Sequence, residues 1–225
     1  MEVPGGHQNK ALVCLYEALG TATLLLAINW TNGGNAYAIA ITIFAAIVVF
    51  GSVSGAHFNP AVTIAVLIKN GKIAKDLPFA VMIIVSQIVG GFIGVLTAFT
   101  SLSKYTTQDG GINWKTRQIA VLCPPIIQTT AGLGDDPCDP TDFVFEIFLV
   151  EFVCTALFVS LFMTIKYHTP SNEGLLGAAS VATTLFGMIN LSAGITGACL
   201  NPAVGFCQSV VQSKMIDSTL PYIDG

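Results

Sequence analysis

Charged side chains are scarce in this sequence. Lys, Arg, Asp and Glu make up 10% of the 225 residues, whereas hydrophobic residues make up 53%, and the mean hydropathy is +0.72. Soluble domains carry about 25% charged residues. A chain this apolar has too little polar surface to face water on all sides, so its composition predicts an integral membrane protein.

Several functional patterns are missing as well. There is no basic cluster that would bind a phosphate backbone, and the net charge is only -4, so no nucleic-acid partner is expected. No Cys-x-x-Cys or Cys/His spacing predicts a metal site, and no nucleophile–base pair or metal triad predicts an enzyme. We therefore expect neither a metal nor a cofactor.

The six cysteines lie in different settings. Cys14 and Cys154 lie inside apolar runs, whereas Cys123 and Cys138 lie in a long polar loop. If that loop is extracellular, Cys123 and Cys138 could form a disulfide.

Long stretches without Asp, Glu, Lys or Arg give the organisation of the chain. They cover residues 18–68, 77–103 and 174–213. The first is too long for one membrane span of about 20 residues and too short for three spans with loops. Interruptions at residues 54–60 and 194–201 cannot continue a helix, and a short apolar helix follows each. The sequence predicts an all-α membrane protein with spans over residues 11–29, 36–53, 77–100, 143–165 and 174–192, and short helices ending near residues 68 and 213.

Lysines in the short connections predict the orientation. Together with Lys10 they place the N-terminus on the cytoplasmic side by the positive-inside rule, and the loop over residues 101–142 outside. The polar start lacks the basic run of a cleavable signal peptide, so the first span is expected to be retained. The lysines concerned are Lys69, Lys72, Lys75 and Lys166.

An internal repeat divides the chain. Residues 54–62 (SGAHFNPAV) align with residues 196–204 (TGACLNPAV), and Glu17 and Glu151 each stand early in a span. We interpret residues 1–225 as one channel domain, with repeat one over 11–100 and repeat two over 143–213. Three spans separate the starts of the two halves, so the second half is inverted relative to the first, as in many membrane transport proteins.

Each half contains an Asn-Pro-Ala motif that predicts the start of a short helix. Asn is a preferred N-cap, and Pro is tolerated in the first helical turn. In lipid, the irregular backbone before such a helix survives only if it is buried or lines an aqueous cavity. Two half-helices meeting at the midplane would offer amide donors to a passing oxygen and a positive potential that repels cations. The motif residues are Asn59, Pro60, Ala61, Asn201, Pro202 and Ala203.

These motifs resemble those of the aquaporins, or major intrinsic proteins. The resemblance rests on residues 54–63, on Asn201-Pro202-Ala203, on Glu17 and Glu151-Phe152, and on residues 86–91. It covers about residues 16–212. It implies a homotetramer in the lipid bilayer with one pore per subunit, each passing water or a small neutral solute and excluding ions and protons.

The resemblance also implies a selectivity filter at four positions. Counted from the motifs, these are Ile39, Ile189, Ala198 and Val204. Most water-selective members have an arginine directly after the second motif, where this chain has Val204. An apolar ring offers few replacement hydrogen bonds to a dehydrating water. It could therefore be wider and favour glycerol, urea, ammonia or hydrogen peroxide, or slow water by dewetting.

Four further residues are candidates for supporting roles. An acidic side chain inside a membrane costs free energy, so its presence there indicates a functional or structural role. For Glu17 and Glu151 the resemblance implies structural braces of the re-entrant loops, and a proton relay is the alternative. His57 either braces its loop or lies beside the pore with its carbonyl facing solute. Cys199 is expected near the pore, which predicts sensitivity to mercurials.

The sequence leaves two other function classes open. A secondary transporter also uses inverted repeats, but its coupling-ion ligands would have to be Glu17 and Glu151. A junctional membrane protein with a silent pore could use the acidic, proline-rich loop for adhesion. The family has six spans, so we expect the natural protein to continue beyond Gly225. The sequence leaves plasma membrane and internal vacuole membrane both possible.

Overall fold

The computed structural model describes residues 9–31, 35–102, 144–168 and 174–215, and these residues form helices without a strand. Five helices are long and apolar enough to cross a membrane. The predicted all-α fold class with five spans is therefore confirmed, whereas Cys123 and Cys138 lie outside the described residues. The long helices are α1 (Lys10–Trp30), α2 (Ala36–Ser54), α4 (Ile73–Leu102), α6 (Val144–His168) and α7 (Gly174–Ser192), and the short ones are α3 (Pro60–Asn70) and α8 (Pro202–Met215).

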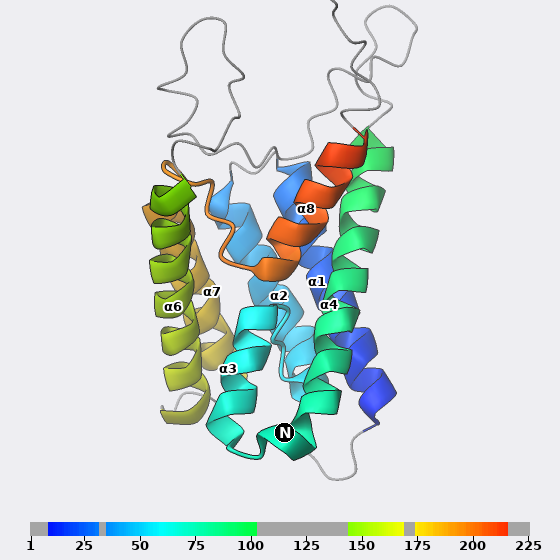
Figure 1. Ribbon diagram of the computed structural model, residues 1–225, viewed down its shortest axis with the longest axis vertical. Coiled ribbons are helices and arrows are strands. Elements are labelled where there is room, and N and C mark those ends of the chain that lie inside the picture. The colour runs from blue at the N-terminus through cyan, green and yellow to red at the C-terminus, as the bar shows by residue number, and fades with distance from the viewer. Residues whose placement is uncertain (1–8, 32–34, 103–143, 169–173, 216–225) are drawn as a thin grey trace, which may run out of the picture.

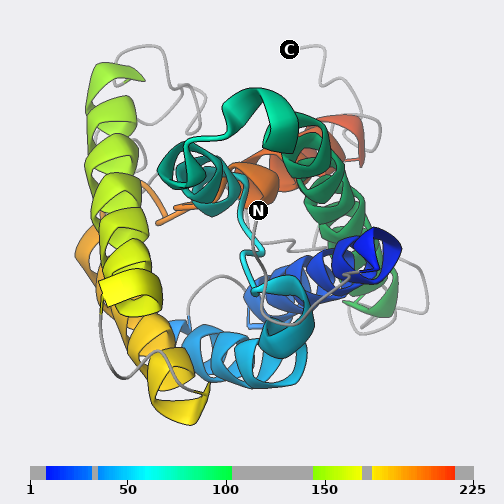
Figure 2. The same ribbon diagram turned by 90° about the horizontal axis from the view of Figure 1, so that it is seen from below.

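The long helices stand around the two short ones. In Figure 1, α3 runs downward from the middle of the molecule and α8 runs upward, so the N-terminal ends of both lie near mid-height. Seen from below in Figure 2, α1 and α4 lie on one side and α6 and α7 on the other, and α2 lies between α1 and α7. This is the arrangement expected of two inverted halves, each of which supplies one half-helix.

The short helices begin where capping chemistry predicts. The side chain of Asn59 accepts from the backbone N–H of Ala61 at 2.8 Å, and Pro60 occupies the first helical turn of α3. The side chain of Asn201 accepts from the N–H of Ala203 at 3.0 Å at the start of α8. Each asparagine thus satisfies a backbone donor that the helix itself cannot.

The helix α4 begins earlier than the sequence predicts. We expected the span to start at Leu77, after Lys75, but α4 starts at Ile73 and includes Pro78. Lys75 is exposed and Asp76 lies in the first turn, where an acidic side chain suits the helix dipole. The charged residues therefore belong to the helix, and they mark where it leaves the apolar layer.

Glycines let α1 and α4 cross closely. A Cβ at Gly90 would clash with the carbonyl oxygen of Ala18, and one at Gly94 would lie 2.8 Å from Leu25 Cβ. At the upper end, the indole N–H of Trp30 donates to Ser101 at 2.9 Å. This tight crossing fixes the backbone from which Glu17 projects.

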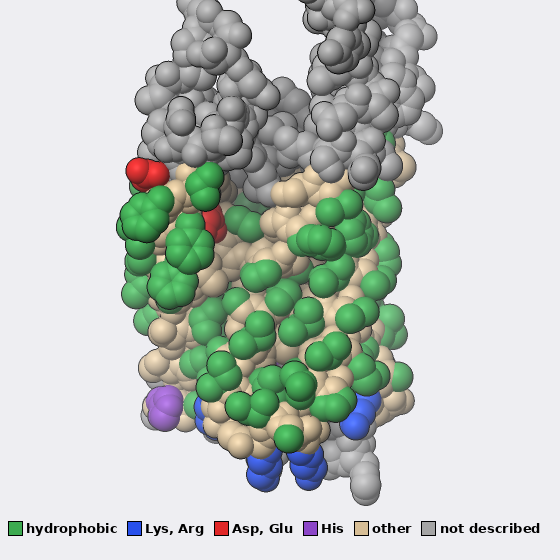
Figure 3. Space-filling view, viewed as in Figure 1, with side chains coloured by type: hydrophobic (Ala, Val, Ile, Leu, Met, Phe, Trp, Pro, Cys, Tyr) green, Lys and Arg blue, Asp and Glu red, His purple; other side chains and the backbone are tan. Residues whose placement is uncertain are grey.

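The outer surface is apolar over most of its height. Figure 3 shows hydrophobic side chains covering the visible face and lysines gathered at its lower end. Large exposed hydrophobic residues on α6 include Phe145, Phe148 and Phe152. A soluble protein rarely exposes so much contiguous apolar surface, so this surface fits contact with lipid.

Candidate functional site: the paired Asn-Pro-Ala motifs

The two Asn-Pro-Ala motifs meet through reciprocal hydrogen bonds. The amide of Asn59 donates to the carbonyl of Leu200 at 2.9 Å, and the amide of Asn201 donates to the carbonyl of Phe58 at 2.8 Å. A side-chain amide carries two N–H groups, and this bond uses one. The second N–H of each asparagine takes no part in this bond.

The backbone before each motif follows one conformational pattern. We call residues 55–59 the first loop segment and residues 197–201 the second. Positive φ angles recur at equivalent positions in both: 84°, 49° and 47° at Gly55, Ala56 and Phe58, and 89°, 58° and 53° at Gly197, Ala198 and Leu200. Left-handed conformations of non-glycine residues cost on the order of 1–3 kcal/mol each and persist only when the surroundings impose them.

Glu17 imposes that conformation on the first loop segment. Its carboxylate is fully buried and accepts from the N–H groups of His57 at 3.0 Å and Phe58 at 2.8 Å. It also accepts from the side-chain amide of Gln87 on α4 at 2.8 Å. The carboxylate thereby satisfies backbone donors of a segment that lies at mid-height, where no helix or sheet partner is present.

Glu151 holds the second loop segment in the equivalent way. Its carboxylate accepts from the N–H groups of Cys199 at 3.0 Å and Leu200 at 2.9 Å, and from the hydroxyl of Thr196. The same acceptor geometry thus occurs in both halves. These contacts support the brace interpretation of the two acids and leave a proton relay without a specific observation in its favour.

Within residues 86–91, Gln87 and Gly91 contact other parts of the bundle. Besides bonding to Glu17, the Gln87 amide donates to the hydroxyl of Thr63 at 3.0 Å. Gly91 lets α8 approach α4, since a Cβ there would lie 2.6 Å from the sulfur of Cys207. In the sequence these residues indicated only a resemblance to the family, because their contacts depend on how α4 packs against α1, α3 and α8.

His57 is buried against α3 and α6. Its Nδ1 lies 3.2 Å from the hydroxyl of Thr63, and its Nε2 lies 3.2 Å from the ammonium of Lys166. The imidazole also meets the ring of Phe162 edge to face, with centroids 6.3 Å apart. Lys166 is a contact that sequence reasoning missed, because a lysine ending an apolar run indicated only the membrane boundary.

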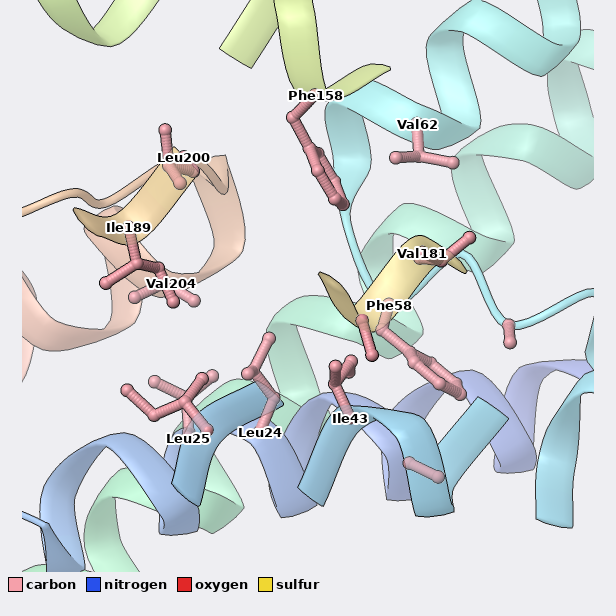
Figure 4. Packing of buried hydrophobic residues seen from close by; sticks show 14 of the residues in the cluster. Leu24, Leu25, Ile43, Phe58, Val62, Phe158, Val181, Ile189, Leu200 and Val204 are labelled. Atoms are coloured by element: carbon pink, nitrogen blue, oxygen red, sulfur yellow. The ribbon is translucent and has the colours of Figure 1, made fainter. Parts of the chain in front are cut away.

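The four predicted filter positions lie in or against one large hydrophobic cluster of the bundle. Ile39, Ile189 and Val204 belong to one buried cluster, and Ala198 packs against it. Figure 4 shows Ile189 and Val204 close to each other within this cluster. They come from α2, α7, the second loop segment and α8, so the fold collects residues that are far apart in the chain.

The thiol of Cys199 lies at the start of α8. It donates to the carbonyl of Asn201 at 3.3 Å, and a Cβ at Gly205 would lie 2.9 Å from its sulfur. Cys199 is partly exposed, and it is a free thiol, as are Cys14, Cys154 and Cys207. Among the described residues, no group of three or more His, Cys, Asp or Glu side chains could hold a metal.

Paired half-helices inside a bundle of spanning helices define a membrane channel. The family model described as "Major intrinsic protein" matches residues 10–224, so the chain belongs to the major intrinsic protein family, as predicted. Membership supports a channel for water and small neutral solutes. The chain is accordingly a multi-pass membrane protein.

Similar proteins support the same assignment. The chain is 30% identical to "Glycerol uptake facilitator protein-like 6" of Lactiplantibacillus plantarum, over 82% of this chain and 73% of that protein. It is 30% identical to "Aquaporin-8" of Notomys alexis, over 73% of this chain but only 54% of that protein. The aquaglyceroporin structure from Plasmodium falciparum matches with a TM-score of 0.67 at 18% identity, covering 95% of this chain and 86% of that one, which shows a shared fold.

Proposed function

We propose that this chain conducts small neutral solutes such as glycerol, urea, ammonia or hydrogen peroxide, in addition to water. The observation that supports this is the reciprocal bonding of Asn59 and Asn201 between the two half-helices. It aligns two helix N-termini at one depth, where their amide donors suit an oxygen or hydroxyl group and their dipoles oppose cations.

The proposed filter determines the range of solutes. Its four side chains, Ile39, Ile189, Ala198 and Val204, are all apolar and carry no charged group. A polar group that leaves water without a replacement partner loses about 1–3 kcal/mol. Water has little apolar surface with which to offset this loss. Glycerol has a carbon face that can contact the four side chains, so the ring favours glycerol relative to water.

The braces on the loop segments argue for a channel rather than a transporter. Each of the two intramembrane acids accepts two backbone N–H bonds, from His57 and Phe58 or from Cys199 and Leu200. A carboxylate engaged in this way holds a fixed element. A coupling-ion site would need ligands that can exchange protein donors for an ion.

Assembly and location belong to the proposal too. The exposed apolar faces of α2, α6 and α7 fit a homotetramer in the bilayer of a plasma or vacuole membrane, with one pore per subunit. Light scattering of the purified protein, corrected for detergent, should give a mass of four chains. A monomeric mass would contradict the tetramer without affecting the pore.

Stopped-flow light scattering of proteoliposomes tests the transport activity. The vesicles are challenged with an impermeant osmolyte and, in a separate experiment, with glycerol. Empty vesicles and a Phe152→Leu variant, altered at an exposed position on α6, are the controls. Rapid glycerol entry with slower water flow is the expected result. Fast shrinkage without glycerol entry would mean a water-selective pore, and no flux above that of empty vesicles would refute the channel.

A further inference from the structure

One lysine near the lower end of the molecule is directed into the fold. The ammonium of Lys166, in the last turns of α6, lies 3.2 Å from the carbonyl oxygen of Gly55 and 3.2 Å from Nε2 of His57. Much of α6 exposes large apolar side chains, whereas this side chain reaches from α6 to the first loop segment. The positive charge is therefore placed beside the approach to the first Asn-Pro-Ala motif.

Hydrogen bonding connects this charge to the motif itself. An ammonium group can only donate, so Nε2 of His57 must accept and Nδ1 must carry the proton. Nδ1 then donates to the hydroxyl of Thr63 at 3.2 Å, and that hydroxyl donates to the carbonyl of Asn59, also at 3.2 Å. Lys166, His57 and Thr63 thus form one ordered chain that ends at the capping residue of α3.

Two aromatic rings lie near the same ammonium. It lies 5.5 Å from the ring centroid of Phe162 and 5.9 Å from that of Tyr167. A second ammonium, that of Lys69 at the end of α3, lies 3.8 Å from the centroid of Tyr167. Contacts of this kind favour a cation over the ring face, so they stabilise two positive charges at one end of the bundle.

We propose that Lys166 is a specificity-determining residue that excludes cations at the end of the pore expected to face the cytoplasm. This inference rests on the proposed channel function. The four proposed filter side chains are uncharged, so they repel no ion by charge. The Lys166 ammonium lies in the field of the Glu17 carboxylate, but that carboxylate is already engaged by the donors of His57, Phe58 and Gln87. The ammonium therefore repels a second cation in these surroundings of low polarity, whereas a neutral solute is not repelled.

The test compares cation flux with glycerol flux in proteoliposomes. Lys166→Met removes the charge and keeps the length of the side chain, and Lys166→Arg keeps the charge. Lys72→Met removes one positive charge from an exposed position in the connection between α3 and α4 and is the matched control. We expect Lys166→Met to raise the ratio of potassium flux to glycerol flux roughly tenfold or more, whereas Lys166→Arg and Lys72→Met keep the wild-type ratio.

A second variant separates charge from hydrogen bonding. Lys166→Gln keeps a donor for Gly55 and His57 but carries no charge, so the same rise in the flux ratio is expected. It also provides the measurement if Lys166→Met fails to fold. An unchanged ratio in a folded uncharged variant would overturn the inference and leave neutral-solute transport intact. Wild-type vesicles that pass neither water nor glycerol would refute the proposed function, and the role of Lys166 with it.

Discussion

The strongest structural prediction concerns the buried carboxylate of Glu17. It accepts three hydrogen bonds, at 3.0, 2.8 and 2.8 Å, from the N–H groups of His57 and Phe58 and from the amide of Gln87. A buried donor left without a partner costs about 1–3 kcal/mol. Glu17→Leu leaves these three donors without an acceptor. The expected loss in the free energy of unfolding is roughly 3–9 kcal/mol, compared with a typical total of about 5–15 kcal/mol.

Glu17→Gln should be milder for a specific reason. A glutamine carbonyl placed where Oε2 of Glu17 lies can still accept from the N–H of Phe58 and from the amide of Gln87. One N–H of the loop segment then remains orphaned, a loss of about 1–3 kcal/mol.

Thermal unfolding of the purified protein in detergent measures both effects. At about 2–4 °C per kcal/mol for a chain of this size, Glu17→Gln should melt roughly 2–12 °C below the wild type. Glu17→Leu should melt roughly 6–36 °C below the wild type, and at the upper end of that range it yields no folded species. Glu146→Gln, at an exposed position in the first turn of α6, controls for loss of the charge. A Glu17→Leu protein that melts like the wild type would refute the brace reasoning.

Three further changes probe the site. Gly20→Ala places a Cβ where it clashes with the ring of Phe58, so a loss of about 1–3 kcal/mol is expected; unchanged thermal unfolding would contradict the packing. Val204→Arg adds a charge and bulk at the proposed filter and should lower glycerol entry relative to water about tenfold in stopped-flow assays. Equal glycerol entry in a folded Val204→Arg protein would show that Val204 does not line the constriction. Mercuric chloride should slow solute flux, and Cys199→Ser should abolish that sensitivity; inhibition that persists in the variant would place the reactive thiol elsewhere.

The sequence by itself determined the class of protein and the positions of its main elements. Long charge-free stretches set four of the five spans, because hydrocarbon excludes unpaired charge and each span needs about 20 residues. The span over residues 143–165 was predicted from its apolar run although it contains Glu146 and Glu151. Asn59-Pro60 and Asn201-Pro202 predicted two helix starts, because capping and proline preferences are local. The first residue of α4 was predicted wrongly, because the charged residues Lys75 and Asp76 belong to the helix.

Only the tertiary structure decided which groups meet. The sequence left Glu17 open as a brace or a relay, and only the fold places the N–H groups of His57 and Phe58 against its carboxylate. Lys166 marked only the membrane boundary in the sequence, and its contact with Gly55 depends on how α6 packs against a segment far away along the chain. Contacts of this kind depend on side-chain direction and helix crossing, and these follow from packing across the whole bundle. Local sequence pattern therefore predicts the elements, whereas the bonding partners at the centre of the bundle arise only when both halves are assembled.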